Sequence, residues 1–146
     1  MGTATHDYDF AMIETAQARM FDAFGGRVQL DMLGFSSRKK LPDWVRRIGM
    51  PPTASASYPG FVNWIAHQPA WDIGLAPLAA TALHLSKSPS KTRHYEAMGL
   101  AMLASDVAVY RRSVSDGAGG ILVPTTEDAW SPASCRTARA TDPRPG

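Results

Sequence analysis

The sequence predicts an α/β fold, in which a Rossmann-like parallel sheet has helices on both faces. Helical and strand-like periodicities alternate along the chain. The strand-like segments, for example residues 71–78 and 121–124, are short runs of nearly continuous apolar residues. Strands covered by helices on both faces have this pattern. The 146 residues, 45% of them hydrophobic, suffice for one domain with its own core.

The first half of the chain predicts two helices around strand and loop segments. Apolar residues recur at helical spacing over residues 7–24, and two glycines then stop the helix. The next segments are a strand over 27–35 and a polar loop over 36–44. Residues 46–57 are proline-rich and predict only a brief strand and a loop. The segment 58–67 predicts a short helix with a proline in its first turn.

The second half repeats the alternation with shorter segments. A strand over 71–78 is followed by a polar helix that begins near Ser88. A second strand covers 101–106, and residues 107–114 predict a turn of helix. A glycine-rich turn leads into the last strand at 121–124.

Charge and composition argue against several classes of protein. The formal net charge is only +2, and the basic residues are spread along the chain, so we expect no nucleic-acid partner. Because Cys135 is the single cysteine, no disulfide can form within the chain, which favours a cytoplasmic protein. No window approaches the roughly 18 apolar residues of a membrane span, and no secretory leader pattern opens the sequence.

A cluster of cations and hydroxyls lies between two of the apolar runs, in the segment KSPSKTRHYEAMG (residues 87–99). Ser88 is a natural N-cap and Pro89 fits the first helical position. Ligands of open parallel sheets bind where strands lead into helices, and the amino end of a helix attracts anions. Lys87 and Lys91 add positive charge at the same place, so the segment predicts a phosphate site. An ordinary solvated helix face is the alternative.

Six segments, taken in order, resemble the C-terminal, donor-binding domain of GT-B fold glycosyltransferases of the family-4-like and family-1 group. These segments extend from about Met1 to Trp130, and they are MGTATHD, YPGFVNWI, WDIGLAPL, KSPSK, MGLAMLASDVAVYR and DGAGGILVPTTEDAW. The resemblance implies a Rossmann-like half that binds a nucleotide diphosphate sugar over residues 1–130. A separate N-terminal half would bind the acceptor and usually supplies the catalytic base.

The resemblance also implies roles for matching residues, and it implies neither cofactor nor metal. Those expected near the donor sugar nucleotide are Gly2, Thr3, Lys87, Ser88, Lys91, Ser105 and Asp106. The turn residues Asp116, Gly117 and Gly120 match as well, where glycine serves backbone geometry. No position is implied for a catalytic residue.

The sequence departs from the family pattern in two regions. His94 stands where relatives carry an acidic residue for the ribose hydroxyls, and Ser90 and Arg93 stand at positions that are usually apolar and buried. Residues 131–146 contain three prolines without apolar periodicity and predict a disordered polar tail, where relatives continue as a long helix. We therefore expect a truncated or decaying copy of a longer transferase.

Two functions follow as hypotheses. The first is the donor-binding half of a glycosyltransferase, which we expect to be inactive without an N-terminal half. The second is a non-catalytic remnant or interaction module that docks on a separate N-terminal acceptor domain. His6 is either a polar residue of the cleft or an exposed loop residue, and the spacing of the four histidines predicts no metal site.

Overall fold

Two small parallel sheets form the centre of the protein. The computed structural model describes residues 6–34, 36–81, 87–114 and 120–141. One sheet pairs β1 (Leu30–Leu33) with β2 (Val45–Ile48), and the other has the order β3 (Ile73–Ala76), β4 (Ala101–Ser105), β5 (Gly120–Val123). Within both sheets, all the paired strands are parallel. The α/β class with parallel strands is thus confirmed. Two separate sheets do not establish the single Rossmann-like sheet that we expected.

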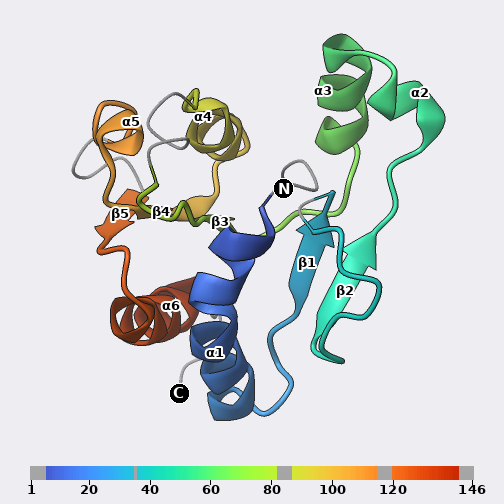
Figure 1. Cartoon of the computed structure of the whole chain (residues 1–146). Helices are drawn as coiled ribbons and strands as arrows, with labels where there is room; N and C mark the ends of the chain where they lie inside the picture. Colours follow the sequence, from blue (N-terminus) through green and yellow to red (C-terminus); the bar gives the residue numbers. More distant parts are fainter. Residues whose placement is uncertain (1–5, 35, 82–86, 115–119, 142–146) are drawn as a thin grey trace.

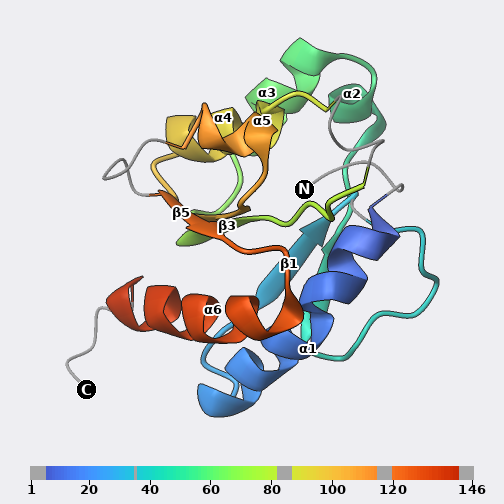
Figure 2. The same ribbon diagram turned by 60° about the vertical axis from the view of Figure 1, so that its left-hand side comes forward.

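Helices lie on both faces of the three-stranded sheet, as Figures 1 and 2 show. The pair α1 (Asp7–Ala23) and α6 (Glu127–Thr141) covers one face. The other face is covered by α4 (Ser90–Ala97) and α5 (Ala108–Arg111). Two further helices, α2 (Pro52–Ser55) and α3 (Tyr58–Ala66), follow β2. The loop expected before α3 is therefore helical in part, since Pro52 opens a single turn that buries Ala54.

Each face of the three-stranded sheet has its own hydrophobic cluster. The first cluster joins α1 and α6 to strands of both sheets through Phe10, Met32, Leu103 and Trp130. The second lies beneath α4 and α5 and includes Tyr95. Strand β4 contributes side chains to both clusters, so both of its faces must be apolar. This explains its continuous apolar run.

The expected disordered tail is wrong for residues 131–141, which continue α6. This helix packs along α1 (Figure 1), and its largest buried side chain is Trp130. Its other buried residues are small or polar: Ala133, Ser134, Thr137 and Ala138. Small and polar residues give no apolar periodicity, and Pro132 lies on the exposed side of the helix.

Helix α4 also corrects two expectations. Its N-cap is Pro89 rather than Ser88, and the first turn is held by Thr92, whose hydroxyl donates to the Pro89 carbonyl. The expected burial of Ser90 and Arg93 is wrong, because both are exposed while Thr92 and Tyr95 face the sheet. The polar residues of this helix therefore carry no burial cost.

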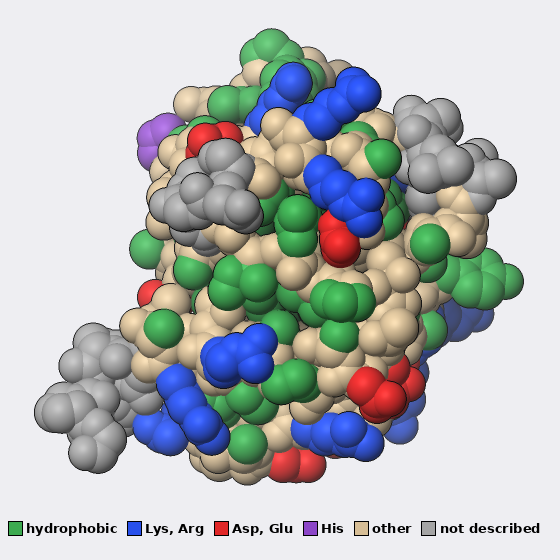
Figure 3. All heavy atoms as spheres, turned by 90° about the vertical axis from the view of Figure 1, so that its left-hand side faces the viewer, with side chains coloured by type: hydrophobic (Ala, Val, Ile, Leu, Met, Phe, Trp, Pro, Cys, Tyr) green, Lys and Arg blue, Asp and Glu red, His purple; other side chains and the backbone are tan. Residues whose placement is uncertain are grey.

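The face formed by α4, α5, β5 and α6 carries mixed charge. Figure 3 shows Lys and Arg side chains scattered over it, with Asp and Glu and apolar side chains between them. The edge strand β5 places the half-exposed Ile121 there. No continuous basic stripe crosses this face in the part of the chain that the structure describes, which agrees with the mild net charge.

Close packing of α4 on β3 generates a stability prediction. A Cβ added at Gly74 would lie 2.5 Å from the Tyr95 ring, so we expect Gly74→Ala to lower the free energy of unfolding by about 1–3 kcal/mol. At Gly49 an added Cβ meets nothing within 4 Å, and Gly49→Ala should change stability by less than about 1 kcal/mol. Urea unfolding of both variants measures the difference, and equal losses would contradict the packing.

Candidate functional site

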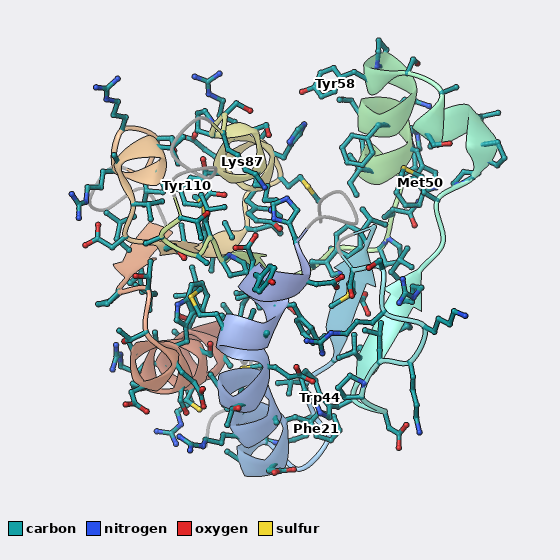
Figure 4. All side chains as sticks on the ribbon, in the orientation of Figure 1. Phe21, Trp44, Met50, Tyr58, Lys87 and Tyr110 are labelled. Carbon is teal, nitrogen blue, oxygen red and sulfur yellow. The ribbon has the colours of Figure 1, made fainter. Side chains whose placement is uncertain are left out.

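Four side chains meet at the carboxyl ends of β3 and β4. His6 and Asp9 come from the start of α1, while Lys87 precedes α4 and Lys91 lies in its first turn. The loop after β3 passes between these helices, and its Ala79 amide contacts Asp9. Figure 4 shows Lys87 beside α4, on the side that faces the start of α1. We call His6, Asp9, Lys87 and Lys91 the basic cluster.

Asp9 is the anchor of the basic cluster. Its side chain is fully buried, and one carboxylate oxygen accepts a 2.7 Å hydrogen bond from the Ala79 amide. The other oxygen is hydrogen-bonded to Nδ1 of His6. Because an ionised carboxylate only accepts, Nδ1 of His6 carries the proton and Nε2 is left as an acceptor.

Both lysines reach the same imidazole nitrogen. Nζ of Lys87 and Nζ of Lys91 each lie 3.4 Å from Nε2 of His6. Ammonium groups only donate, so the two compete for one acceptor and their charges repel each other. Against the single carboxylate of Asp9 the basic cluster is positive. An anion placed between the lysines would relieve the repulsion.

Burial and mutual repulsion shift the pKa values of the basic cluster. The hydrogen bond with Asp9 raises the pKa of His6, but burial and the charges of Lys91 and Lys87 outweigh it, so the pKa lies below its usual value. Burial lowers the pKa of Lys91 to about 8, the charge of Asp9 opposes this shift, and Lys87 adds to it. His6 is therefore neutral at pH 7, and Lys91 exchanges its proton more easily than an ordinary lysine.

Tyr110 of α5 lies under the same region (Figure 4) and has a buried side chain. Burial, with a further contribution from the charge of Asp9, raises the pKa of its phenol to about 12. The phenol therefore stays protonated and neutral across the physiological range. The electrostatic influence of Asp9 thus extends from α1 to both α4 and α5.

The structure brings some of the expected donor-binding residues together and separates others. Lys87 and Lys91 converge, and the exposed Ser88 lies beside them in sequence. Ser105 is fully buried, with its hydroxyl accepting a 2.8 Å hydrogen bond from the Leu78 amide, and so holds the loop under the basic cluster. Asp106 pairs instead with Arg111 of α5 at 2.5 Å. Gly2, Thr3, Asp116 and Gly117 lie outside the described residues.

Two members of the basic cluster were not among the expected site residues. His6 was left open between a cleft residue and an exposed loop residue, and the structure places it 5% exposed at the N-cap of α1. Asp9 follows three residues later, the spacing that puts two side chains on one side of a helical turn. This spacing is the sequence feature that indicates a His6–Asp9 pair. Without it, Asp9 would be interpreted as an ordinary acid of a first helical turn, which interacts favourably with the helix dipole.

His94, which departs from the family pattern, has a different contact. Its Nε2 lies 2.9 Å from the Tyr58 hydroxyl, and its ring meets that of Phe61 edge-on with centroids 5.7 Å apart. These contacts connect α4 to α3 and therefore bridge the two halves of the fold. They do not involve the basic cluster.

The described residues contain neither a metal-ligating cluster nor a membrane-spanning helix. No group of three or more histidine, cysteine or acidic side chains is placed to hold a metal ion within those residues. None of the helices within the same ranges has the length and apolar character needed to cross a membrane. Comparison with known proteins gave no match either, whether to a family model, a curated protein or a solved structure. The glycosyltransferase resemblance therefore stays a prediction.

The role of Asp9 can be tested by removing its charge. We expect Asp9→Asn to lower the free energy of unfolding by about 1.5–3 kcal/mol, because Lys91 loses its counter-charge and His6 its anionic partner. The pKa of His6 should fall further, since the Asp9 hydrogen bond is what raises it. Urea unfolding and NMR titration of the imidazole measure the two effects. The control is Asp22→Asn at the exposed end of α1, and a His6 pKa unchanged in Asp9→Asn would refute the role.

Burial of Lys91 predicts a pH-dependent stability. Its pKa of about 8 lies below the usual 10.5, so between these values the unfolded chain holds a proton that the folded chain has lost. Stability should therefore rise with pH across this window, on the order of 1–3 kcal/mol. Chemical unfolding at about pH 7.5 and about pH 9.5 measures the rise. Lys91→Met should remove it and the exposed Lys39→Met should retain it; a rise that survives Lys91→Met would contradict the assignment.

Proposed function

We propose that the protein binds the diphosphate of a nucleotide sugar at the basic cluster and serves as the donor-binding half of a glycosyltransferase. The observation that carries this proposal is the convergence of Lys87 and Lys91 on His6 Nε2 at 3.4 Å each. Two half-buried ammonium groups within reach of one imidazole nitrogen repel each other, and a diphosphate would supply two or more negative charges between them.

The position of the basic cluster also supports the proposal. It lies beyond the carboxyl ends of parallel strands, where loops lead into helices and open α/β sheets bind their ligands. The first turn of α4 directs backbone N–H groups toward the same region, and its partial positive charge adds to that of the lysines. A Rossmann-like arrangement of the two sheets is part of this proposal.

In the proposed reaction the bond between the anomeric carbon and the diphosphate oxygen breaks, and a bond to an acceptor hydroxyl oxygen forms. The hydroxyl proton passes to a base of the acceptor-binding half. Lys87 and Lys91 stabilise the negative charge that develops on the departing diphosphate. His6, held as the Nδ1 tautomer by Asp9, can also orient a phosphate oxygen if it gains a second proton.

Nucleotide titration tests this function. UDP, GDP and their sugar conjugates are added to the protein, and the melting temperature is followed. The matching diphosphate, at about a hundredfold of its Kd, should raise Tm by about 5–10 °C. Lys87→Ala and Lys91→Ala should each weaken binding about tenfold or more, whereas Lys39→Ala and Lys40→Ala in the exposed loop should not.

The controls separate diphosphate recognition from other effects. Uridine and guanosine lack the phosphates and should bind far more weakly than the diphosphates. No shift with any nucleotide would contradict the donor-binding function and favour the interaction module that docks on a separate acceptor domain.

A further inference from the structure

A cavity of about 560 Å³ lies between β1 and β3, and we call it the interstrand cavity. Apolar residues of the two strands line it, among them Leu30, Leu33, Ile73 and Leu75. Helices close it on both sides, with α1 and α6 contributing to one wall and α4 to the other. The cavity therefore occupies the middle layer of the molecule, at the place where the two sheets fail to join.

Contacts at both ends show that β1 and β3 run in the same direction along the cavity. At the carboxyl end, Asp7 accepts a 2.6 Å hydrogen bond from Ser37 just after β1, while Asp9 binds Ala79 just after β3. At the amino end, Nε1 of Trp71 donates to Asp31 of β1 at 2.8 Å. The first turn of α1 thus bridges the loops that follow β1 and β3.

The strands that border the cavity each have one ladder partner among the described residues. β1 pairs with β2, and β3 pairs with β4. Their facing edges therefore present backbone groups toward the interstrand cavity, which is apolar along Leu33 and Leu75 and polar at its amino end, where Arg27, Asp31 and Arg46 lie. Proteins usually pair or cover such edges. A strand placed between two edges would be paired on both sides, because neighbouring strands lie about 4.8 Å apart.

A buried polar atom at the wall of the cavity also lacks a partner. Gln17 of α1 is fully buried and donates from Nε2 to Ser134 of α6 at 2.8 Å. Its Oε1 has no hydrogen-bond partner within the described part of the chain. Leaving such an acceptor unpaired costs about 1–3 kcal/mol, so a donor belongs beside it.

We propose that the interstrand cavity receives one extended apolar strand of about five residues that runs parallel to β1 and β3 and leads into α1. The strand order would become β2, β1, inserted strand, β3, β4, β5. The inserted strand, α1 and β1 would then form a right-handed βαβ unit, and the order would be that of a doubly wound sheet. This inference does not depend on nucleotide binding.

The start of α1 identifies this occupant. A strand that ends at the carboxyl edge needs only a short connection to α1, because Asp7 and Asp9 of its first turn lie at that edge. A small molecule would leave both strand edges unpaired. Every strand that the structure describes is already paired within its own chain, so none of these strands is available to a second copy. An added strand in register with both edges would hydrogen-bond to the backbones of β1 and β3, and its side chains would fill the interstrand cavity.

The experiment uses the full chain with a five-residue leader placed ahead of its first residue. The probe leader is Ile-Val-Val-Ile-Val, and the matched control leader is Gly-Ser-Gly-Ser-Gly. Hydrogen exchange should slow by about tenfold or more at the amides of β1 and β3 with the probe leader relative to the control. Exchange in β5, at the outer edge of the sheet, should stay unchanged.

Two further measurements test whether the probe leader occupies the interstrand cavity. Ile73→Glu places a charge on the cavity wall and should cancel the protection that the probe leader gives, whereas Val62→Glu on the exposed side of α3 should not. Sedimentation velocity should show monomers with either leader. Equal exchange with both leaders, protection that survives Ile73→Glu, or protection that accompanies dimer formation would each overturn the proposal.

Discussion

The buried carboxylate of Asp9 is the constraint on which this end of the molecule depends. A charge without solvent contact is costly unless it is paired and hydrogen-bonded, so each neighbour of Asp9 must supply a donor or a positive charge. The Ala79 amide and His6 do so directly, and Lys91 does so through its charge. One side chain of α1 therefore fixes the loop after β3 and orients α4.

That constraint also explains why the lysines are close together. Lys91 is drawn toward Asp9 while burial opposes its charged form, and Lys87 approaches the same imidazole from outside the helix. The result is a site in which two ammonium groups and one carboxylate surround the same imidazole. Shifted pKa values like that of Lys91 are frequent at functional sites.

Most helices and strands could be predicted from the sequence because their apolar residues repeat at a clear period, as in α1 and β4. Helix α6 could not, because it buries alanine, serine and threonine against α1 and has a proline on its exposed side. The lysine pair was predictable from its place before a helix. Its partners His6 and Asp9 were indicated only by their spacing of three residues, since only the folded chain shows that this acid of the first turn is buried.

Site and sheet are joined through the same few residues at the start of α1. Asp9 holds the basic cluster, and Asp7, two residues earlier, holds the loop after β1, so the first turn of α1 bridges the two sheets across the cavity. A strand in the cavity would fix this turn through the backbone, and an anion at His6 would fix it through charge. Both the strand and the anion would stabilise the same first turn of α1. Strand insertion and anion binding should therefore favour each other without any direct contact between strand and anion.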